Sequence, residues 1–330
     1  MINGPLRFVY FLNKLQVLLN TASKQKNPAL WLYKNDARTP LFMLEALSKM
    51  YSKIHNKKKF TKLKEQFKLL EDTIGAIDYY DNIAKDTSTS HKIPADITSY
   101  LLAQTREKIQ SLNEILVEKG WLSTDHKRIK KIQKNLNEAD WLHEEEEIKA
   151  INEFYGEAIY DITEFIQTDA YHFDNIEADV HELRRRLRWL SIYPHSLLGT
   201  IQLSKNKTSQ KWLSKYLTKE ITGSAFNKLP DANDSVCFLL LEQSYFYSLS
   251  WMIAELGKIK DNGLHVVAVK EALVQTAQLT EEDALKKTYS LLGPKQKKIE
   301  QLLKDASAIC KVYFGEQNLE NLVVGIRSVK

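Results

Sequence analysis

The residues with the clearest chemical potential lie in one short stretch, VHELRRRLRWL, from Val180 to Leu190. One histidine and three arginines of this stretch follow the helical spacing i, i+3, i+4, i+7: His181, Arg184, Arg185 and Arg188. Residues at this spacing form one stripe along a helix. Arginine donates two parallel hydrogen bonds to phosphate and stays charged at any working pH, and a protonated histidine adds a donor. The stripe predicts a binding site for a phosphate-rich anion.

The same helix must also supply a core face. Its apolar residues fall on one side at 100° per residue: Val180, Leu183, Leu187 and Leu190. Like charges at i,i+4 repel, so the neighbouring basic stripe costs stability unless something offsets it. Glu177 lies one turn before His181 and can neutralise that end, but the helix offers no acid to Arg184 and Arg188. Either carboxylates of another helix or a ligand must therefore offset these two charges.

Four lysines are predicted to extend this site as secondary contributors: Lys211, Lys215, Lys258 and Lys260. Lysines repeated every four residues are also typical of a plain solvated surface. Two interpretations of the basic residues thus stand side by side. They form either one wall of an anion site or a salt-bridged outer face.

The composition predicts an all-α protein without a sheet. Glycine (11) and proline (7) are scarce in 330 residues, and no alternating apolar pattern ends in hairpin turns. Helices are expected near Leu6–Thr21, Thr39–Ile54, Phe60–Ala84, Asp96–Lys119, Thr124–Asn137, Glu144–Thr168, Tyr171–Ile192, Ser209–Thr222, Ser235–Lys258, Leu264–Leu279, Glu281–Leu292, Pro294–Phe314 and Gln317–Arg327. Hydrophobic residues make up 43% and charged residues 27%, which is typical of a globular chain.

Other features set the compartment and exclude common activities. No apolar run is long enough for a membrane span and the first helix reads as amphipathic, so we expect a cytoplasmic protein without a membrane partner. Cys237 and Cys310 have no paired or metal-binding spacing.

HEEEE at His143–Glu147 lacks the second histidine of a metalloprotease and is interpreted as a solvated helix start. With no P-loop, dinucleotide or nucleophile motif, we expect no catalysis, no metal and no cofactor.

Two further stretches are basic enough to contact nucleic acid, HNKKKF (His55–Phe60) and HKRIKKIQK (His126–Lys134). A surface that binds nucleic acid by stacking interleaves aromatic residues with basic ones, and neither stretch does. We therefore do not expect a nucleic-acid partner.

A weak internal repeat links the two halves of the chain. TIGAIDY around Gly75 resembles ELGKIKD around Gly257, and each follows a stretch with basic residues, ARTPLFMLEAL with Arg38 and VHELRRRLRWL with His181. The separations differ, since Arg38 precedes its glycine by 37 residues and His181 precedes its glycine by 76. A duplicated unit would therefore require that one copy gained or lost a helix pair.

The stretches VHELRRRLRWL and ELGKIKD resemble the two signatures of CHAD domains, the conserved-histidine α-helical domains. In that pattern His181 and Arg184 take the first two places, and Arg188 begins a later basic cluster. The resemblance covers Ala170 to Leu279 and, more weakly, Thr39 to Ala84. It implies two four-helix units and a basic channel that binds inorganic polyphosphate or a similar polyanion.

The sequence thus predicts an all-α, CHAD-like body of two tandem helical-bundle units, residues 1–168 and residues 169–330 with the basic helix. The expected function is non-enzymatic binding of inorganic polyphosphate or another phosphate-rich polyanion. The alternative is a structural scaffold with a protein partner, in which the arginines are salt-bridged within the chain.

Overall fold

The computed structural model describes residues 3–123, 125–204, 211–232 and 237–328, and it is predominantly helical, as the composition predicts. Its α-helices are α1 Gly4–Ala22, α2 Pro28–Lys34, α3 Arg38–Ile54, α4 Lys57–Ser88, α5 Ala95–Glu118, α6 Lys127–Asn137, α7 Glu144–Thr168, α8 Glu182–Ser196, α9 Lys219–Gly223, α10 Gln243–Ala277, α11 Glu281–Leu292 and α12 Ile299–Gly315. A π-helix, Ile176–His181, leads into α8, and short 3₁₀-helices span Lys211–Lys215 and Ala225–Asn227.

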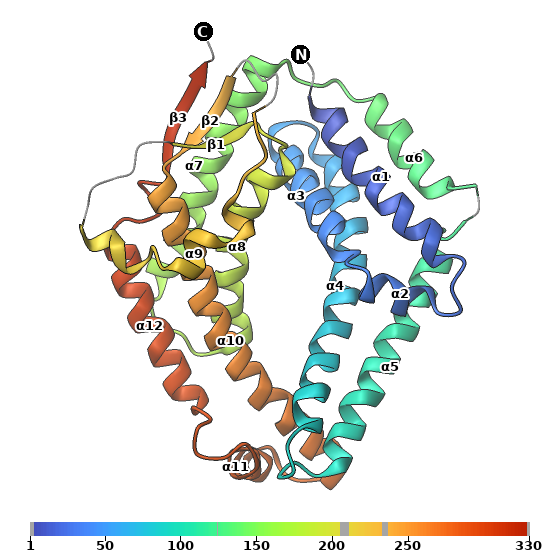
Figure 1. The fold of residues 1–330 in the computed structure, drawn as a ribbon, viewed down its shortest axis with the longest axis vertical. Helices are drawn as coiled ribbons and strands as arrows, with labels where there is room; N and C mark the ends of the chain where they lie inside the picture. The colour runs from blue at the N-terminus through green and yellow to red at the C-terminus, as the bar shows by residue number, and fades with distance from the viewer. Residues whose placement is uncertain (1–2, 124, 205–210, 233–236, 329–330) are drawn as a thin grey trace.

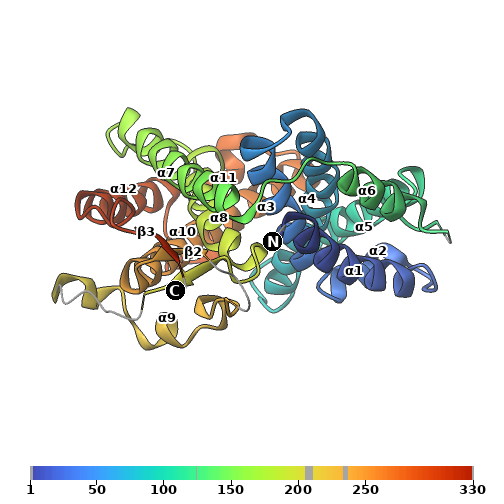
Figure 2. The same cartoon turned by 90° about the horizontal axis from the view of Figure 1, so that it is seen from above.

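The helices pack into one body (Figure 1). Helices α1 to α6 lie on one side and α7 to α12 on the other, while α3 and α8 pack against each other in the middle. The view from above (Figure 2) shows α12 and α7 toward one end and α5 and α6 toward the other. The two long helices α4 and α10 converge at the lower end of Figure 1, near α11. None of the helices that the structure describes combines the length and the apolar character needed to span a membrane.

A continuous hydrophobic core runs through both halves of the chain, from Phe8 in α1 to Leu322 just before β3. A second, smaller cluster closes the lower end, where Ile83 of α4 and Leu101 of α5 join Ala272 of α10. The C-terminal half of α10 therefore packs on helices of the first half. The predicted units, residues 1–168 and 169–330, are accordingly in contact at the middle and at the lower end of the body.

A small sheet corrects the expectation that the chain has none. Strand β1 (Ile201–Leu203) pairs in parallel with β2 (Cys237–Leu241), which pairs antiparallel with β3 (Val323–Ser328). The sequence of β2, CFLLL, is a short continuous apolar run, and periodicity cannot separate such a run from a buried helix turn. The predicted helix at Ser235–Lys258 therefore begins at Gln243 instead, and a turn followed by β3 stands in place of the predicted last helix, Gln317–Arg327.

Other element boundaries also differ from the expected ones. Helix α2 was not predicted, although Asn27 caps its start and Pro28 occupies its first turn, a position that proline favours. The predicted helix Ser209–Thr222 begins outside the described residues, and its described part is a 3₁₀-helix followed by α9. The two predicted helices on either side of Gly263 form one continuous helix, α10.

A buried ion pair fastens α1 to the centre of the body. The guanidinium of Arg7 lies 2.8 Å from a carboxylate oxygen of Glu147, and it donates hydrogen bonds to Tyr51 and Thr200. Arg7 and Glu147 are only 3% and 2% exposed. The sequence placed Glu147 in a solvated helix start, so the structure corrects that interpretation: Glu144 and Glu147 are both buried. Burial by itself lowers the pKa of Arg7, but Tyr51 and Glu147 outweigh this effect and raise it.

Candidate anion-binding site

Two arginines, one from each half of the chain, lie against a glycine in a long helix. Arg38, the first residue of α3, lies over Gly75 of α4, where an added Cβ atom would come within 2.6 Å of Nη2. Arg184 of α8 lies over Gly257 of α10, where an added Cβ atom would lie 3.0 Å from Nε. Glycine has no side chain and therefore lets each guanidinium approach the helix backbone. The repeat of Arg38 with Gly75 and of the basic stretch with Gly257 thus corresponds to two similar contacts in space.

The two arginines differ in what they contact. Arg38 donates from Nε to Glu71 at 2.6 Å, and its Nη1 lies 3.4 Å from a carboxylate oxygen of Asp78. Arg184 instead donates from Nε to the backbone carbonyl oxygen of Ile253 at 3.1 Å. Among the residues that the structure describes, no carboxylate lies within ion-pair distance of Arg184. One guanidinium is thus neutralised within the chain, whereas the other is not.

The residues at matching offsets from the two glycines explain why Arg38 has carboxylate partners and Arg184 has none in the described structure. Glu71 and Asp78 lie four residues before and three residues after the glycine of α4. The same offsets from the glycine of α10 hold Ile253 and Lys260. Helix α4 therefore presents two acids to its arginine, while α10 presents an apolar side chain and a base at the corresponding positions.

Arg188 adds a second uncompensated charge one turn further along α8. Its guanidinium lies over the ring of Phe42, 4.2 Å from the centroid, and that of Arg38 lies 5.2 Å from the same ring. Within the described part of the chain, the Arg188 side chain has no carboxylate partner and donates no hydrogen bond. Burial, followed by the charges of Arg184 and Arg38, lowers the pKa of Arg188 to about 10. Three guanidiniums are therefore close enough to influence one another.

The pKa of Arg184 is lowered for the same reasons as that of Arg188. Arg184 is half-buried, and burial lowers its pKa from the ordinary value, an effect that Arg38 reinforces. The charge of Asp261 opposes this shift only in part. Both arginines of α8 therefore carry desolvated positive charge that the fold does not fully offset, which is the condition for attracting an anion.

The other members of the predicted stripe have carboxylate partners within the helix. His181 Nδ1 lies 2.8 Å from Glu177, and the hydrogen bond from His181 lowers the pKa of that carboxyl group. Arg185 and Arg186 both pair with Glu182, at 2.5 Å and 2.8 Å. The sequence grouped His181 and Arg185 with the anion-binding residues, but their carboxylate partners lie one turn away and occupy them. The predicted site therefore narrows to Arg184 and Arg188.

Most of the predicted lysines are occupied as well. Three of them form ion pairs at 2.5 to 2.7 Å: Lys215 with Glu316, Lys258 with Glu255, and Lys260 with Asp261. Lys211 is exposed at the start of a 3₁₀-helix. These side chains do not extend the uncompensated charge of α8.

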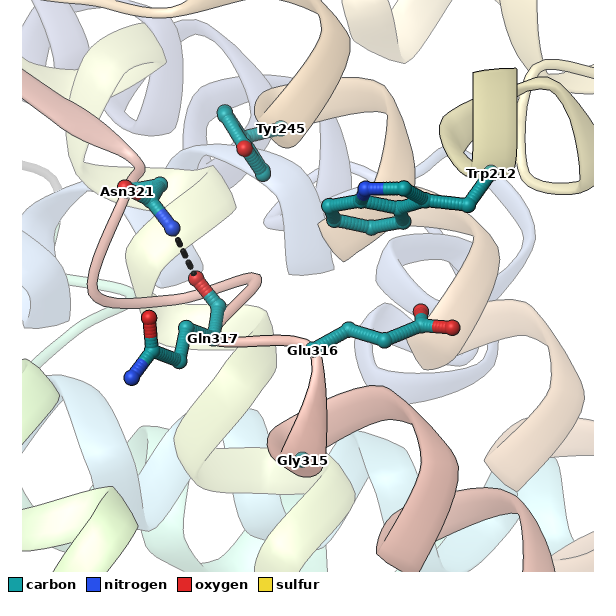
Figure 3. Close-up of a pocket in the computed structure, with 6 residues that line it drawn as sticks. All are labelled: Trp212, Tyr245, Gly315, Glu316, Gln317 and Asn321. Atoms are coloured by element: carbon teal, nitrogen blue, oxygen red, sulfur yellow. Dashed lines mark hydrogen bonds between the residues drawn. The ribbon is translucent and has the colours of Figure 1, made fainter. Parts of the chain in front are cut away.

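A separate pocket of about 570 Å³ lies between the start of α10 and the end of α12 (Figure 3). It is lined by Trp212, Tyr245, Gly315, Glu316, Gln317 and Asn321. Figure 3 shows the two aromatic rings on one side and the turn after α12 on the other. Glu316 is the one charged residue of this lining, and it already holds Lys215 at 2.5 Å and the hydroxyl of Tyr216 at 2.6 Å. The pocket contains no residue of the predicted anion site.

The sequence did not predict two residues that contact or adjoin Arg184 and Arg188, namely Arg38 and Phe42. In the sequence, Arg38 stands out only as part of the repeat, and Phe42 has no signal beyond its place one turn later on the same helix face. The pairing of an arginine with a downstream glycine in both halves was the available signal for Arg38. The periodicity of one helix does not identify the helices that pack against it, so the sequence did not predict that α3 packs against α8.

Glu45 is a buried acid on the same helix as Arg38. It is 4% exposed, and within the described structure its Oε2 atom has no hydrogen-bond partner. Burial, assisted by the charge of Glu71, raises its pKa to about 7. One turn further on, Lys49 lies 5.0 Å from the ring centroid of Trp189, and burial lowers its pKa to about 8.

Replacing Glu45 by glutamine is expected to make the stability of the chain less dependent on pH between about pH 5 and pH 8. Because the folded-state pKa lies near 7 rather than at 4.5, folding favours the protonated acid, and this stability is lost as pH rises through about 7. Between pH 5 and pH 8, Glu45→Gln should gain about 2 to 3 kcal/mol of unfolding free energy relative to wild type. Urea unfolding at both pH values measures it, with the exposed Glu65→Gln as control. An equal pH dependence in wild type and Glu45→Gln would contradict it.

No family model, curated protein or solved structure matches the chain. The resemblance of VHELRRRLRWL and ELGKIKD to the CHAD signatures therefore stays a prediction. What supports a function is the geometry around Arg184 and Arg188.

Proposed function

We propose that the chain is a non-enzymatic module that binds inorganic polyphosphate or another phosphate-rich anion through Arg184 and Arg188. The observation that carries this proposal is the contrast between two similar contacts. Arg38 lies on Gly75 with two carboxylates, whereas Arg184 lies on Gly257 with none among the described residues. An oxyanion on Arg184 would play the part that Glu71 plays on Arg38.

The cost of desolvating Arg184 and Arg188 without an anionic partner favours a bound ligand at these side chains. A half-buried guanidinium without an ionic partner loses hydration and regains little, so Arg184 and Arg188 cost stability in the free chain. Phosphate oxygens would restore charge-assisted hydrogen bonds to both groups. Stacking on Phe42 holds Arg188 in place, so less side-chain entropy is lost when the anion binds.

The site would lie where the two predicted units meet. Arg38 and Phe42 come from residues 1–168 and the two free arginines from residues 169–330. The predicted internal duplication and the CHAD relationship are part of this proposal. The contact of Arg38 with Gly75 and that of Arg184 with Gly257 support the duplication. The segment from β1 to β2 lies between the basic stretch and the glycine of the second half, and it accounts for their longer separation in sequence. Two free, buried cysteines fit the expected cytoplasmic compartment.

The alternative, an interaction scaffold, is favoured by the basic residues near the stripe that do have carboxylate partners. His181, Arg185 and Arg186 hold carboxylates of their own helix, which is typical of a salt-bridged outer face. This interpretation leaves Arg184 and Arg188 without a role, and for that reason we favour anion binding.

Calorimetric titration with medium-chain polyphosphate tests the proposal, with Ile253→Glu as the diagnostic variant. Wild type should bind with a dissociation constant that rises about tenfold or more between about 50 and about 200 mM salt. Ile253→Glu places a carboxylate at the offset that Glu71 has from its glycine, so it should neutralise Arg184 and weaken binding about tenfold.

Ile253→Gln is the matched control, since it changes shape and polarity in the same way without adding charge. It should stay within about threefold of wild type. Absence of binding heat for wild type at low salt would overturn the proposal, and equal losses in the two variants would show that Arg184 is not the recognition group.

A further inference from the structure

We infer that the anion held by Arg184 and Arg188 is compact, with the dimensions of pyrophosphate or tripolyphosphate, and that longer polyphosphate chains gain no affinity per bound segment. This inference rests on the proposed function and specifies its ligand. It follows from where the basic residues around the two arginines have already been neutralised.

Along α8, the free charge is confined to one face. Towards the N-terminus, His181 is held by Glu177. On the adjacent face, Arg185 and Arg186 are both held by Glu182. An extended polyanion that followed this helix beyond Arg184 would have to compete with these carboxylates for His181, Arg185 and Arg186.

The neighbouring helices limit the site in the same way. On α10, the basic residues next to Gly257 pair with Glu255 and Asp261. On α3 and α4, Arg38 contributes its charge together with the opposing charges of Glu71 and Asp78. Apart from Arg184 and Arg188, the basic residues named above on α8, α10 and α3 therefore have carboxylate partners, whereas Lys49 of α3, which lies over Trp189, has no ion pair in the described structure. The basic channel that the CHAD resemblance implies is reduced here to a short site.

The dimensions of the pair point to the same ligand class. Arg184 and Arg188 are separated by one helical turn, about 5.4 to 6 Å along the axis, a length that two or three linked phosphate groups cover. The guanidiniums of Arg188 and Arg38 both contact the ring of Phe42, an apolar surface that offers no conventional hydrogen bond. Two fixed charges match two neighbouring phosphate groups, and further groups would remain in solvent.

A chain-length series tests this inference with the full-length protein. The probes are orthophosphate, pyrophosphate, tripolyphosphate, and polyphosphates of about ten and about one hundred units, titrated calorimetrically at low salt. The dissociation constant should fall from orthophosphate to tripolyphosphate and then stay within about threefold per binding segment. Long chains should bind several protein molecules each, because one protein molecule covers a short segment.

The possible results separate the two proposals. A gain of about tenfold or more per segment between three and ten phosphate units would overturn the compact site while leaving anion binding intact. Absence of heat with every probe would overturn the proposed function itself. Lys258→Gln removes a compensated neighbouring charge and should keep the tripolyphosphate affinity within about threefold. A larger loss would show that the site extends along α10, which also contradicts the inference.

Discussion

Replacing Arg184 and Arg188 together by glutamine is expected to lower the affinity for tripolyphosphate by about a hundredfold or more. Each guanidinium supplies charge-assisted hydrogen bonds to phosphate that contribute about 1.5 to 3 kcal/mol, and glutamine keeps polarity without charge. Titration calorimetry at low salt measures the loss. Thermal unfolding of the same variant should show no loss of stability, because in the described chain neither arginine has a carboxylate partner and burial lowers the pKa of both.

Arg185 and Arg186 provide the matched control. Replacing both by glutamine removes the same formal charge from the same helix, but these two side chains are held by Glu182. The affinity for tripolyphosphate should therefore stay within about threefold of wild type, apart from a general electrostatic effect. If both double variants lost affinity equally, binding would depend on net charge rather than on the uncompensated pair.

Replacing Arg7 by methionine is expected to lower the free energy of unfolding by about 3 to 5 kcal/mol, the largest stability effect that we predict. The substitution leaves the carboxylate of Glu147, which is 2% exposed, buried without its cation. It also removes the donor that Arg7 provides to the hydroxyl of Tyr51 and to Thr200. Urea unfolding followed by circular dichroism measures the change.

The double variant Arg7→Met with Glu147→Leu separates a lost ion pair from a lost shape. Breaking a buried pair is costly because one charge remains, whereas an apolar pair of similar volume removes both charges. The double variant should therefore recover most of the stability that Arg7→Met loses. A double variant as unstable as the single one would show that packing around α1, rather than the stranded carboxylate, accounts for the loss.

Helical periodicity and end signals predicted most of the fold. The predicted bounds of α7, Glu144–Thr168, and of α11, Glu281–Leu292, agree with the structure, because acidic first turns mark both starts and Gly293 ends α11. The sheet could not be predicted in the same way. Strands β1 and β2 are short segments separated in sequence, and they form a sheet only by pairing with each other and with β3.

The candidate site was predictable only in part, because helical spacing shows which residues share a face but not what packs against that face. A helical wheel placed Arg184 and Arg188 on one stripe, and the structure leaves these two without carboxylate partners in the described residues. The same wheel places Glu182 one turn before Arg185 and Arg186, so these ion pairs could have been predicted, but it did not show that both arginines share this one carboxylate. It also gave no information on which helices face α8, so the contribution of Arg38 depended on tertiary packing.

An experimental structure of the chain with tripolyphosphate tests the central claim most directly. We predict phosphate oxygens within hydrogen-bonding distance of the guanidiniums of both Arg184 and Arg188, with Arg185 still paired to Glu182. An anion bound instead at Lys211, or at Arg185 with its ion pair broken, while Arg184 and Arg188 remain without an anion, would contradict the claim.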